Sequence, residues 1–462
     1  MNTLKNNKQA GELNTNLLNT LLVKYSKESK ILKWDVGASS SRDISVQVQQ
    51  GNAKQLKGSQ RHSMTLRVWN SNNKVGITST SDLTNEGIRK AMKGAIEASA
   101  FGNKNESPEF SSLAKTPIKE IDTEISKAHD IDELLTILKN AEDKLMKTHK
   151  SIDSVPYNGL SESYLERIYI NSDGANRHMK LSQSSIYLYA KAQLDNKKPR
   201  SAGGIRINSD LDQLDIDSCI KETSDKLISH LNYQSIETKK YLVCFTPDAF
   251  LQLVSAFSSM FNARSIIDGL SLMNEQSLGD QIAVKNLNIS DEGLHPKNVG
   301  AFSFDGEGTP TQNINLIESG VLKNLIHSEA TARRFGVKPT GHAGLGAKVS
   351  VNPDWLVIGK SNDEVDKDKS LNIKNTLKEY ILIDELTALH SGVKATQGSF
   401  SLPFDGWIVN EGKRTSIEAA TVAGDILKVL NSIVKIENEQ IVTHQGISPY
   451  VWVENMSITG EA

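Results

Sequence analysis

The sequence contains little cysteine: among its 462 residues only Cys219 and Cys244 are present. Two cysteines are too few for a disulfide framework or a four-cysteine zinc site, and they fit a reducing compartment. No stretch approaches the roughly 18 uncharged apolar residues of a membrane-spanning helix. The N-terminal residues Met1 to Gly11 are polar, and no apolar segment of a secretion signal follows them. We therefore expect a cytoplasmic protein with no membrane association.

Metal-binding and nucleotide-binding motifs are also absent. The ten histidines are scattered, and the closest two, His327 and His342, are fifteen residues apart. No single helical turn can therefore present two imidazoles to a metal ion. Neither a P-loop, nor Gly-x-Ser-x-Gly, nor Gly-x-Gly-x-x-Gly occurs. With 53 Lys and Arg against 55 Asp and Glu, the net charge of −2 provides no bulk attraction to nucleic acid.

The sequence does contain enough apolar material for two or three folded domains, since 38% of its 462 residues are hydrophobic. In the first half, segments with helical spacing alternate with segments of strand-like alternation. We predict helices over 13–25, 88–96, 131–146 and 216–231, strands over 44–49, 65–69, 75–78, 165–170 and 182–192, and a polar loop over 103–128. This pattern indicates an N-terminal α/β domain with a mixed sheet and helices, which we place at residues 1–236.

The second half, residues 237–462, has a different character. A helix is predicted to begin after Pro247, with Asp248 in its first turn, and to run to about Ala263. Short strands separated by turns are predicted over 282–289, 314–317, 355–358, 380–383, 406–410, 433–436 and 450–458, with a solvated loop over 363–369. Short strands at this density are typical of a barrel or a sandwich. The whole chain is therefore predicted to be an α+β protein whose C-terminal domain is sheet-rich and barrel-like.

Two segments of the second half could carry chemistry. In Phe304-Asp305-Gly306-Glu307-Gly308 two carboxylates flank a glycine, so in an extended chain both would point the same way. They could form the polar rim of a cleft, but an acidic turn is the plainer interpretation because Asp and Gly favour turns. Thr340-Gly341-His342 lies in a glycine-rich loop whose amides could hold an anion or a peptide carbonyl. A lone histidine is more often structural than catalytic, so His342 alone does not indicate an active site.

The order of the segments resembles that of a known family. The second half shows a strand, Pro and helix at 241–263, followed by Phe304-Asp305-Gly306-Glu307-Gly308, Ile317-Glu318-Ser319-Gly320-Val321-Leu322, Thr340-Gly341-His342-Ala343 and Thr421-Val422-Ala423-Gly424-Asp425-Ile426. The first half adds Val75-Gly76-Ile77-Thr78-Ser79-Thr80 and Asn171-Ser172-Asp173-Gly174. Over nearly the whole chain, this series resembles the TldD/PmbA family of peptidase-complex proteins, and within it the PmbA branch, also called TldE.

The resemblance implies which branch is catalytic. The TldD-type subunit of the family carries a His-Glu-x-x-x-His helix, and a cysteine close to its C-terminus completes a zinc site. Here the matching segment reads Ser255-Ala256-Phe257-Ser258-Ser259-Met260, and no cysteine follows Cys244. The chain therefore resembles the metal-free PmbA/TldE partner, with no catalytic or metal-binding residue of its own.

As a PmbA/TldE-like subunit, the chain would assemble with a TldD-like catalytic subunit that holds the zinc. The resemblance implies a homodimer or hetero-oligomer that encloses a chamber for small or unfolded peptides. Asp305, Glu307, Thr340, Gly341 and His342 fall on motif positions of the family. We therefore expect these five residues to contact a peptide substrate or to shape the subunit interface.

Two other functions stay open. The chain could hydrolyse peptides itself through scattered ligands such as His327, His342 and Glu307, in which case the purified protein would hold stoichiometric zinc. It could instead act alone as a modulator of another protein, since PmbA-like proteins have also been described as gyrase modulators. The near-neutral charge and the missing DNA-binding motif argue against direct contact with DNA, but not against binding a DNA enzyme.

Overall fold

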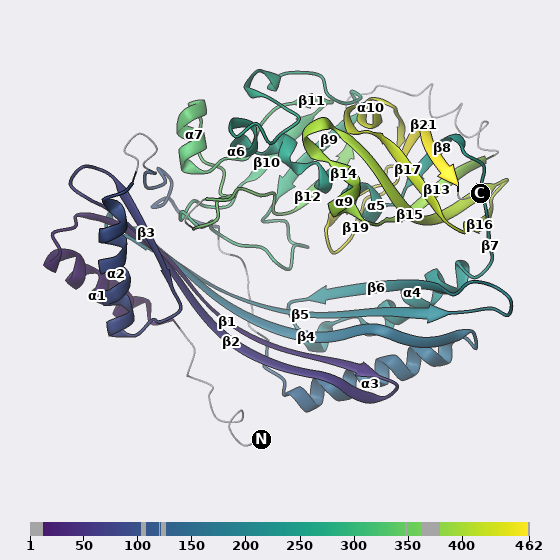
Figure 1. The fold of residues 1–462 in the computed structure, drawn as a ribbon, viewed down its shortest axis with the longest axis horizontal. Helices are drawn as coiled ribbons and strands as arrows, with labels where there is room; N and C mark the ends of the chain where they lie inside the picture. The colour runs from purple at the N-terminus through teal and green to yellow at the C-terminus, as the bar shows by residue number, and fades with distance from the viewer. Residues whose placement is uncertain are drawn as a thin grey trace.

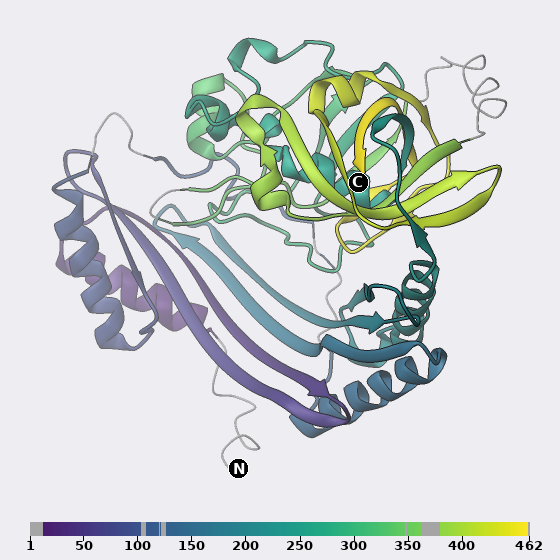
Figure 2. The same ribbon diagram turned by 45° about the vertical axis from the view of Figure 1, so that its right-hand side comes forward.

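The computed structural model describes residues 13–102, 108–119, 121, 126–346, 349–361 and 379–460. A long curved sheet from the first half lies along one side of the rounded second half (Figures 1 and 2). Helices and strands are both abundant, so the α+β prediction is confirmed. The loop predicted over 363–369 lies outside the described residues, and the loop over 103–128 is described only in part.

The first half forms one six-stranded sheet in the order β3-β2-β1-β4-β5-β6. Its strands are β1 (Lys33–Gln49), β2 (Asn52–Trp69), β3 (Val75–Thr80), β4 (Ile152–Asn171), β5 (Asn176–Ala192) and β6 (Arg200–Asn208). All neighbouring strands are antiparallel, whereas the sequence predicted a mixed sheet. The reason is the connections: a tight turn at 50–51 joins β1 to β2, and another at 172–175 joins β4 to β5, so consecutive strands reverse direction.

The strands are much longer than predicted. β4 has 20 residues, which at about 3.3 Å per residue gives roughly 65 Å, whereas strands of about 5–6 residues are the most common. Only the apolar part of each strand shows the alternation that sequence analysis recognises. The polar continuation of β2 is exposed over its first ten residues, so burial leaves no pattern there.

One face of the sheet is covered by helices and the other faces the second half. Val36 and Leu66 pack under α1 (Thr15–Glu28) and α2 (Asn85–Ser99). Further along the same face, Val46, Leu160 and Ile186 pack under α3 (Ile131–Thr148) and α4 (Ile216–Ser229). Side chains alternate along a strand. Away from the register shifts near residues 47–48 and 152–157, the odd-numbered residues of β1, β2, β4 and β5 therefore lie on the concave face, toward the second half (Figure 1).

The second half contains a closed barrel. Five strands pair in a ring, β13 with β8, β8 with β21, β21 with β17, β17 with β15, and β15 back to β13. They are β8 (Lys239–Phe245), β13 (Glu379–Leu386), β15 (Ser399–Asn410), β17 (Ala420–Asp425) and β21 (Val451–Gly460). Closure removes the free edges of these strands, and it confirms the barrel-like prediction for this half.

A second sheet packs beside the barrel in the order β11-β10-β9-β12-β20-β19. Its strands are β9 (Leu287–Glu292), β10 (Asn313–Glu318), β11 (Val321–Leu322), β12 (Leu356–Lys360), β19 (Ile441–Val442) and β20 (Gly446–Ser448). The other described strands and α-helices that follow α4 are β7 (Tyr233–Gln234), β14 (Val393–Lys394), β16 (Lys413–Ile417), β18 (Ile433–Ile436), α5 (Pro247–Ala256), α6 (Ala263–Ile267), α7 (Glu329–Phe335), α9 (Leu389–Gly392) and α10 (Ile426–Asn431).

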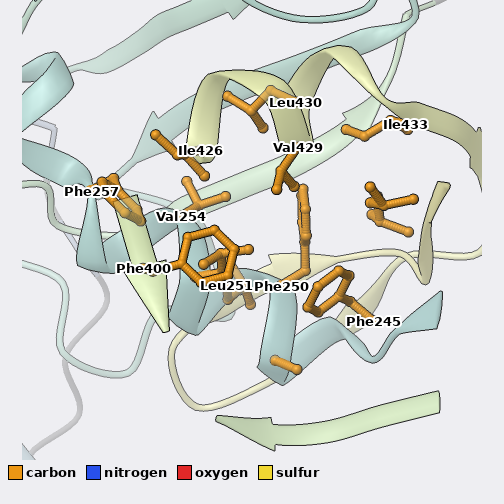
Figure 3. Close-up of a cluster of buried hydrophobic side chains, with 14 of the residues drawn as sticks. Phe245, Phe250, Leu251, Val254, Phe257, Phe400, Ile426, Val429, Leu430 and Ile433 are labelled. Carbon is orange, nitrogen blue, oxygen red and sulfur yellow. The ribbon is translucent and has the colours of Figure 1, made fainter. Parts of the chain in front are cut away.

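The core of the second half is built around α5. Figure 3 shows Phe250 and Val254 of this helix beside Val429 of α10, and all three are buried. Each such side chain gains roughly 1.5–3 kcal/mol on burial. Packing of this density fixes the barrel, the second sheet and α5 into one unit.

Helix α5 begins as predicted but ends early. Thr246 accepts a hydrogen bond from the amide of Ala249, and Pro247 occupies the first helical turn. The helix was predicted to reach about Ala263, yet it stops at Ala256, and a 3-10 turn follows over Ser258–Phe261. The cause is a new N-cap: the side chain of Asn262 accepts hydrogen bonds from the first amides of α6, so the chain starts a second helix there.

The passage from one half to the other runs through β7, which already pairs with β16 of the second half. The domain border predicted between residues 236 and 237 stays a prediction. Among the helices in the described ranges, none combines the length and the apolar composition that crossing a bilayer requires.

Candidate functional site

A buried charge network joins the concave face of the sheet to the turn at 304–309. Arg67 of β2 donates through Nε to Asp35 Oδ1 at 2.8 Å and through Nη2 to Asp35 Oδ2 at 2.5 Å. Its Nη1 lies 3.3 Å from Glu307 Oε1, and Tyr169 Oη donates to Asp35 Oδ2 at 3.0 Å. Burial opposes the charge on Arg67, but the attraction of Asp35 outweighs it and raises the pKa of the guanidinium. The network ties together two parts of the chain that are far apart in sequence.

Asp305 organises the turn that carries Glu307. Its Oδ1 accepts the amides of Glu307 at 2.8 Å and Thr309 at 3.0 Å, and its Oδ2 accepts the amide of Ala343 at 2.9 Å. Burial and the neighbouring charge of Glu307 raise the pKa of Asp305, while the three amides act in the opposite direction. Asp305 therefore fastens the turn to the glycine-rich loop at 340–346.

The glycine-rich loop places His342 in a second buried cluster. His342 Nδ1 lies 2.8 Å from Thr340 Oγ1, and its Nε2 lies 3.2 Å from Asp291 Oδ2. Burial disfavours the imidazolium, but Asp291 raises the pKa of His342. Thr340 Oγ1 also accepts the amide of His327 at 2.8 Å, and burial lowers the pKa of His327 to about 4. Gly341, which lies between Thr340 and His342, has φ +82°, a conformation that favours glycine.

The five predicted site residues thus lie close to one another, and all are buried. Most of their polar atoms are engaged in holding the turn and the loop together. Asp305 is the member of the set that lines a cavity. The expectation that the five contact peptide stays a prediction.

That cavity lies between the sheet and the second half and has a volume of about 260 Å³. The sheet contributes Ser39, Ser63, Thr65 and Arg167, and the second half contributes Phe302, Asp305, Gly306 and Leu345. The concave face around it is rich in hydroxyl groups that pair across strands at 2.9–3.0 Å: Ser39 with Ser63, Thr65 with Ser79, and Ser161 with Ser185. The result is a polar surface beside a small, walled cavity.

By the resemblance described above, the metal site of the family's catalytic branch would correspond to Ser255–Met260. In this chain Phe257 and Met260 are buried in the core, and Ser255 and Ala256 line a second cavity of about 390 Å³. Among the described residues lining that cavity, His390 supplies an imidazole and no carboxylate or thiolate accompanies it. Zinc takes Cys, His and carboxylate ligands, so the residues of this segment do not fit a zinc ion.

The ligands considered for a self-contained peptidase are engaged elsewhere. Glu307 contacts Arg67 and accepts the amide of Glu329 at 2.9 Å, and His327 Nδ1 lies 3.2 Å from Thr331 Oγ1. Within the described ranges, no three His, Cys, Asp or Glu side chains stand close enough together to hold a metal ion. His327, His342 and Glu307 therefore do not form a ligand set in this structure.

Sequence analysis missed the sheet residues that complete the site. Asp35, Arg67, Arg167 and Tyr169 occupy odd positions of their strands, opposite the helix-covered face. The alternation of β2 and β4 places them on that face, but it does not show that the second half covers it. A charged residue between two apolar neighbours, as in Leu66-Arg67-Val68, was the available signal.

Comparison with known proteins places the chain in a family. Models of the PmbA/TldA metallopeptidase domain 1, central domain and C-terminal domain match residues 34–99, 124–231 and 238–460. Together these matches cover most of the sequence. The chain belongs to the PmbA/TldD metallopeptidase family, and the resemblance seen in the sequence is confirmed.

Two relatives that match most of the chain carry the PmbA name. Metalloprotease PmbA of Escherichia coli O157:H7 is 22% identical over 451 residues, 92% of each chain. The PmbA homologue of Buchnera aphidicola (subsp. Baizongia pistaciae) is 21% identical over 395 residues, 84% of each chain.

Solved structures share the fold. A proposed modulator of DNA gyrase from Thermotoga maritima superposes with a TM-score of 0.84 at 23% identity, over 96% of this chain and 100% of that one. TldE from Thermococcus kodakarensis superposes with a TM-score of 0.82 at 19% identity, again over 96% and 100%.

Proposed function

We propose that the chain is a non-catalytic PmbA/TldE-like subunit of a TldD/TldE-type zinc metallopeptidase complex, which processes small unfolded peptides in the cytoplasm. The observation that carries the proposal is the segment Ser255–Met260. The family resemblance places the zinc ligands of the catalytic branch at this segment, which here offers hydroxyl and apolar side chains, with Phe257 and Met260 buried. A TldD-like subunit would supply the zinc and the hydrolytic step.

In this complex the chain would form part of a chamber wall. The concave face offers hydroxyl groups to a peptide, and the buried network of Asp35, Arg67 and Glu307 supports a fixed relation between the sheet and the second half. Asp305, Thr340, Gly341 and His342 would shape the wall beside the cavity. A homodimer or a hetero-oligomer would close the chamber.

The test is reconstitution with a TldD-type protein from the same genome that carries His-Glu-x-x-x-His and a late cysteine. We expect the two chains to co-elute in size-exclusion chromatography with light scattering, and the mixture to hydrolyse unfolded peptides. The chain alone should be inactive and should contain substoichiometric zinc by mass spectrometry of metals. A partner with its first motif histidine changed to alanine is the matched control, and it should assemble without activity.

Two outcomes would overturn the proposal. Stoichiometric zinc together with hydrolysis by the chain alone would establish a self-sufficient peptidase. The description of the Thermotoga maritima protein favours a gyrase modulator as a second candidate. Co-elution with gyrase and an effect on DNA supercoiling, without binding to the TldD-type protein, would establish that role.

A further inference from the structure

One arginine of the concave face differs from the others in its contacts with the described residues. Arg61 pairs with Asp43, Arg67 pairs with Asp35, and Arg177 donates to the carbonyl of Gly308. Arg167, on the same face, lines the 260 Å³ cavity, and within the described residues its side chain forms neither an ion pair nor a hydrogen bond. A half-buried cation without a partner is costly, so the cavity is suited to an anion.

The guanidinium of Arg167 lies over two aromatic rings. Its central carbon lies 5.2 Å from the ring centroid of Phe302 and 5.8 Å from that of Phe304. Contacts of this kind use the flat face of the guanidinium. Its N–H groups lie in the plane, where they form the parallel pair of donors that matches a carboxylate.

Neutral donors line the same cavity. Ser39 and Ser63 share one hydrogen bond at 2.9 Å, so the hydroxyl that accepts it keeps its own proton for another acceptor. Asp305 and Asp354 attract Arg167 through space. Neither makes a hydrogen bond or ion pair with it among the described residues, and both oxygens of Asp305 accept backbone amides. The combination of a positioned cation and free hydroxyl protons is complementary to a carboxylate.

The size of the cavity limits what enters it. A volume of about 260 Å³ is below the roughly 300–1,000 Å³ that hold a whole drug-sized ligand. It admits the end of a peptide or one side chain. Tyr169, which belongs to the Asp35 and Arg67 network, lines the same cavity.

We propose that this cavity is a carboxylate-recognition site for the peptide substrate, with Arg167 as the ion-pair partner of a C-terminal carboxylate or of an Asp or Glu side chain. The proposal rests on the peptide-processing role proposed above. Its test measures binding to the chain alone, so it does not depend on assembly with a catalytic subunit.

Isothermal titration calorimetry with three probes tests the site: trialanine with a free C-terminus, trialanine amide, and N-acetyl-Ala-Glu-Ala amide. The free acid should bind wild-type protein at least about tenfold more tightly than trialanine amide, as expected for a charge-assisted pair. Tight binding of the glutamate probe would identify a side chain as a second source of the carboxylate. Arg167→Gln should weaken carboxylate probes about tenfold and leave the amide unchanged, and Arg167→Lys should lie between.

Arg61→Gln is the matched control, because Arg61 lies on the same face and is well exposed, and it should bind every probe as wild type does. The acid and amide comparison needs no variant, so it holds even if Arg167→Gln fails to fold. Equal binding of acid and amide, no binding of any probe, or wild-type binding by folded Arg167→Gln would each overturn the proposal. If the probes bind as expected but the reconstituted complex does not hydrolyse peptides, the result would count against the proposed function and not against the carboxylate site.

Discussion

Arg67 and Glu307, which are 240 residues apart in the sequence, form an ion pair at 3.3 Å with both side chains shielded from solvent. Such a pair contributes little net stability when it is intact, but the loss of one partner leaves a buried charge uncompensated. Asp35 accepts more hydrogen bonds within the network than Glu307 does, with two from Arg67 and one from Tyr169.

Asp35→Asn should therefore lower the free energy of unfolding by about 3–5 kcal/mol, and Glu307→Gln by less, because Arg67 then keeps Asp35. Urea denaturation followed by circular dichroism measures both. Asp43→Asn is the control, since it removes a partner of the well-exposed Arg61 and should cost at most about 1 kcal/mol. Equal losses for Asp35→Asn and Asp43→Asn would contradict a supporting role for the network.

Gly341 and Gly412 form a matched pair for testing the loop. Both have φ +82°, but a Cβ on Gly341 would lie 2.3 Å from the carbonyl oxygen of Pro310, whereas none of the described atoms lies within 4 Å of a Cβ on Gly412. Gly412→Ala should cost about 1 kcal/mol from backbone strain alone. Gly341→Ala should cost a further 1–3 kcal/mol or so from the clash. Thermal unfolding of the two variants measures the difference, and equal melting temperatures would show that the loop yields easily.

His230 should make the protein sensitive to mild acid. Burial lowers the pKa of His230 to about 4, and the charges of Arg200 and Lys226 add to this. Between the unfolded value of about 6.5 and about 4, the unfolded chain takes up a proton that the folded chain does not, so stability falls as the pH falls. From pH 7 to pH 5, wild type should lose about 2 kcal/mol more than His230→Gln does.

Urea midpoints at the two pH values measure the effect of His230. The imidazole stacks on Trp407 with ring centroids 4.6 Å apart and lies 2.8 Å from Ser416 Oγ, so the variant also loses stability at pH 7, and only the pH dependence is diagnostic. His327→Gln provides an independent comparison, because burial lowers the pKa of His327 to about 4 as well. Variants with the same pH dependence as wild type would show that these imidazoles become protonated within the folded state.

A substitution in the cavity lined by Ser255 tests whether that cavity takes part in peptide hydrolysis. Ala256 lines this cavity of about 390 Å³, so Ala256→Leu can place its added carbons in open space. If the chain is a non-catalytic subunit, peptide hydrolysis by the reconstituted complex should be unchanged. A fall in kcat with folding and assembly intact would show that this cavity takes part in the reaction.

Local signals in the sequence predicted the elements whose ends have local causes. Pro247 begins α5 as predicted, and Thr84, a residue type that favours N-caps, caps α2 through the amide of Gly87. The early end of α5 could also have been read from Asn262, a good N-cap residue. The length of β4 could not have been predicted in this way, because its polar stretches show no apolar alternation and its pairing partner β1 is remote in sequence.

The candidate site was predicted only on one of its two sides. The spacing of Asp305 and Glu307 and the glycines around them drew attention to the turn, and the structure places that turn beside His342. Asp35 and Arg67 were not predicted, because their burial depends on a domain that covers the sheet from more than 200 residues away. When a residue is buried by a different domain, its own strand shows no periodic pattern that reveals the burial, as for Asp35 in β1 and Arg67 in β2.

The long second strand has a consequence for association between molecules. β3 pairs with β2 only along Met64–Trp69, so over the exposed first ten residues of β2 no other described strand covers its outer edge. A bare edge of this length is a template for stacking copies of the same chain. Lys54, Lys57 and Arg61 lie along it, and two such edges brought together would oppose like charges. The protein thus carries its own electrostatic protection against sheet-to-sheet aggregation at its most open border.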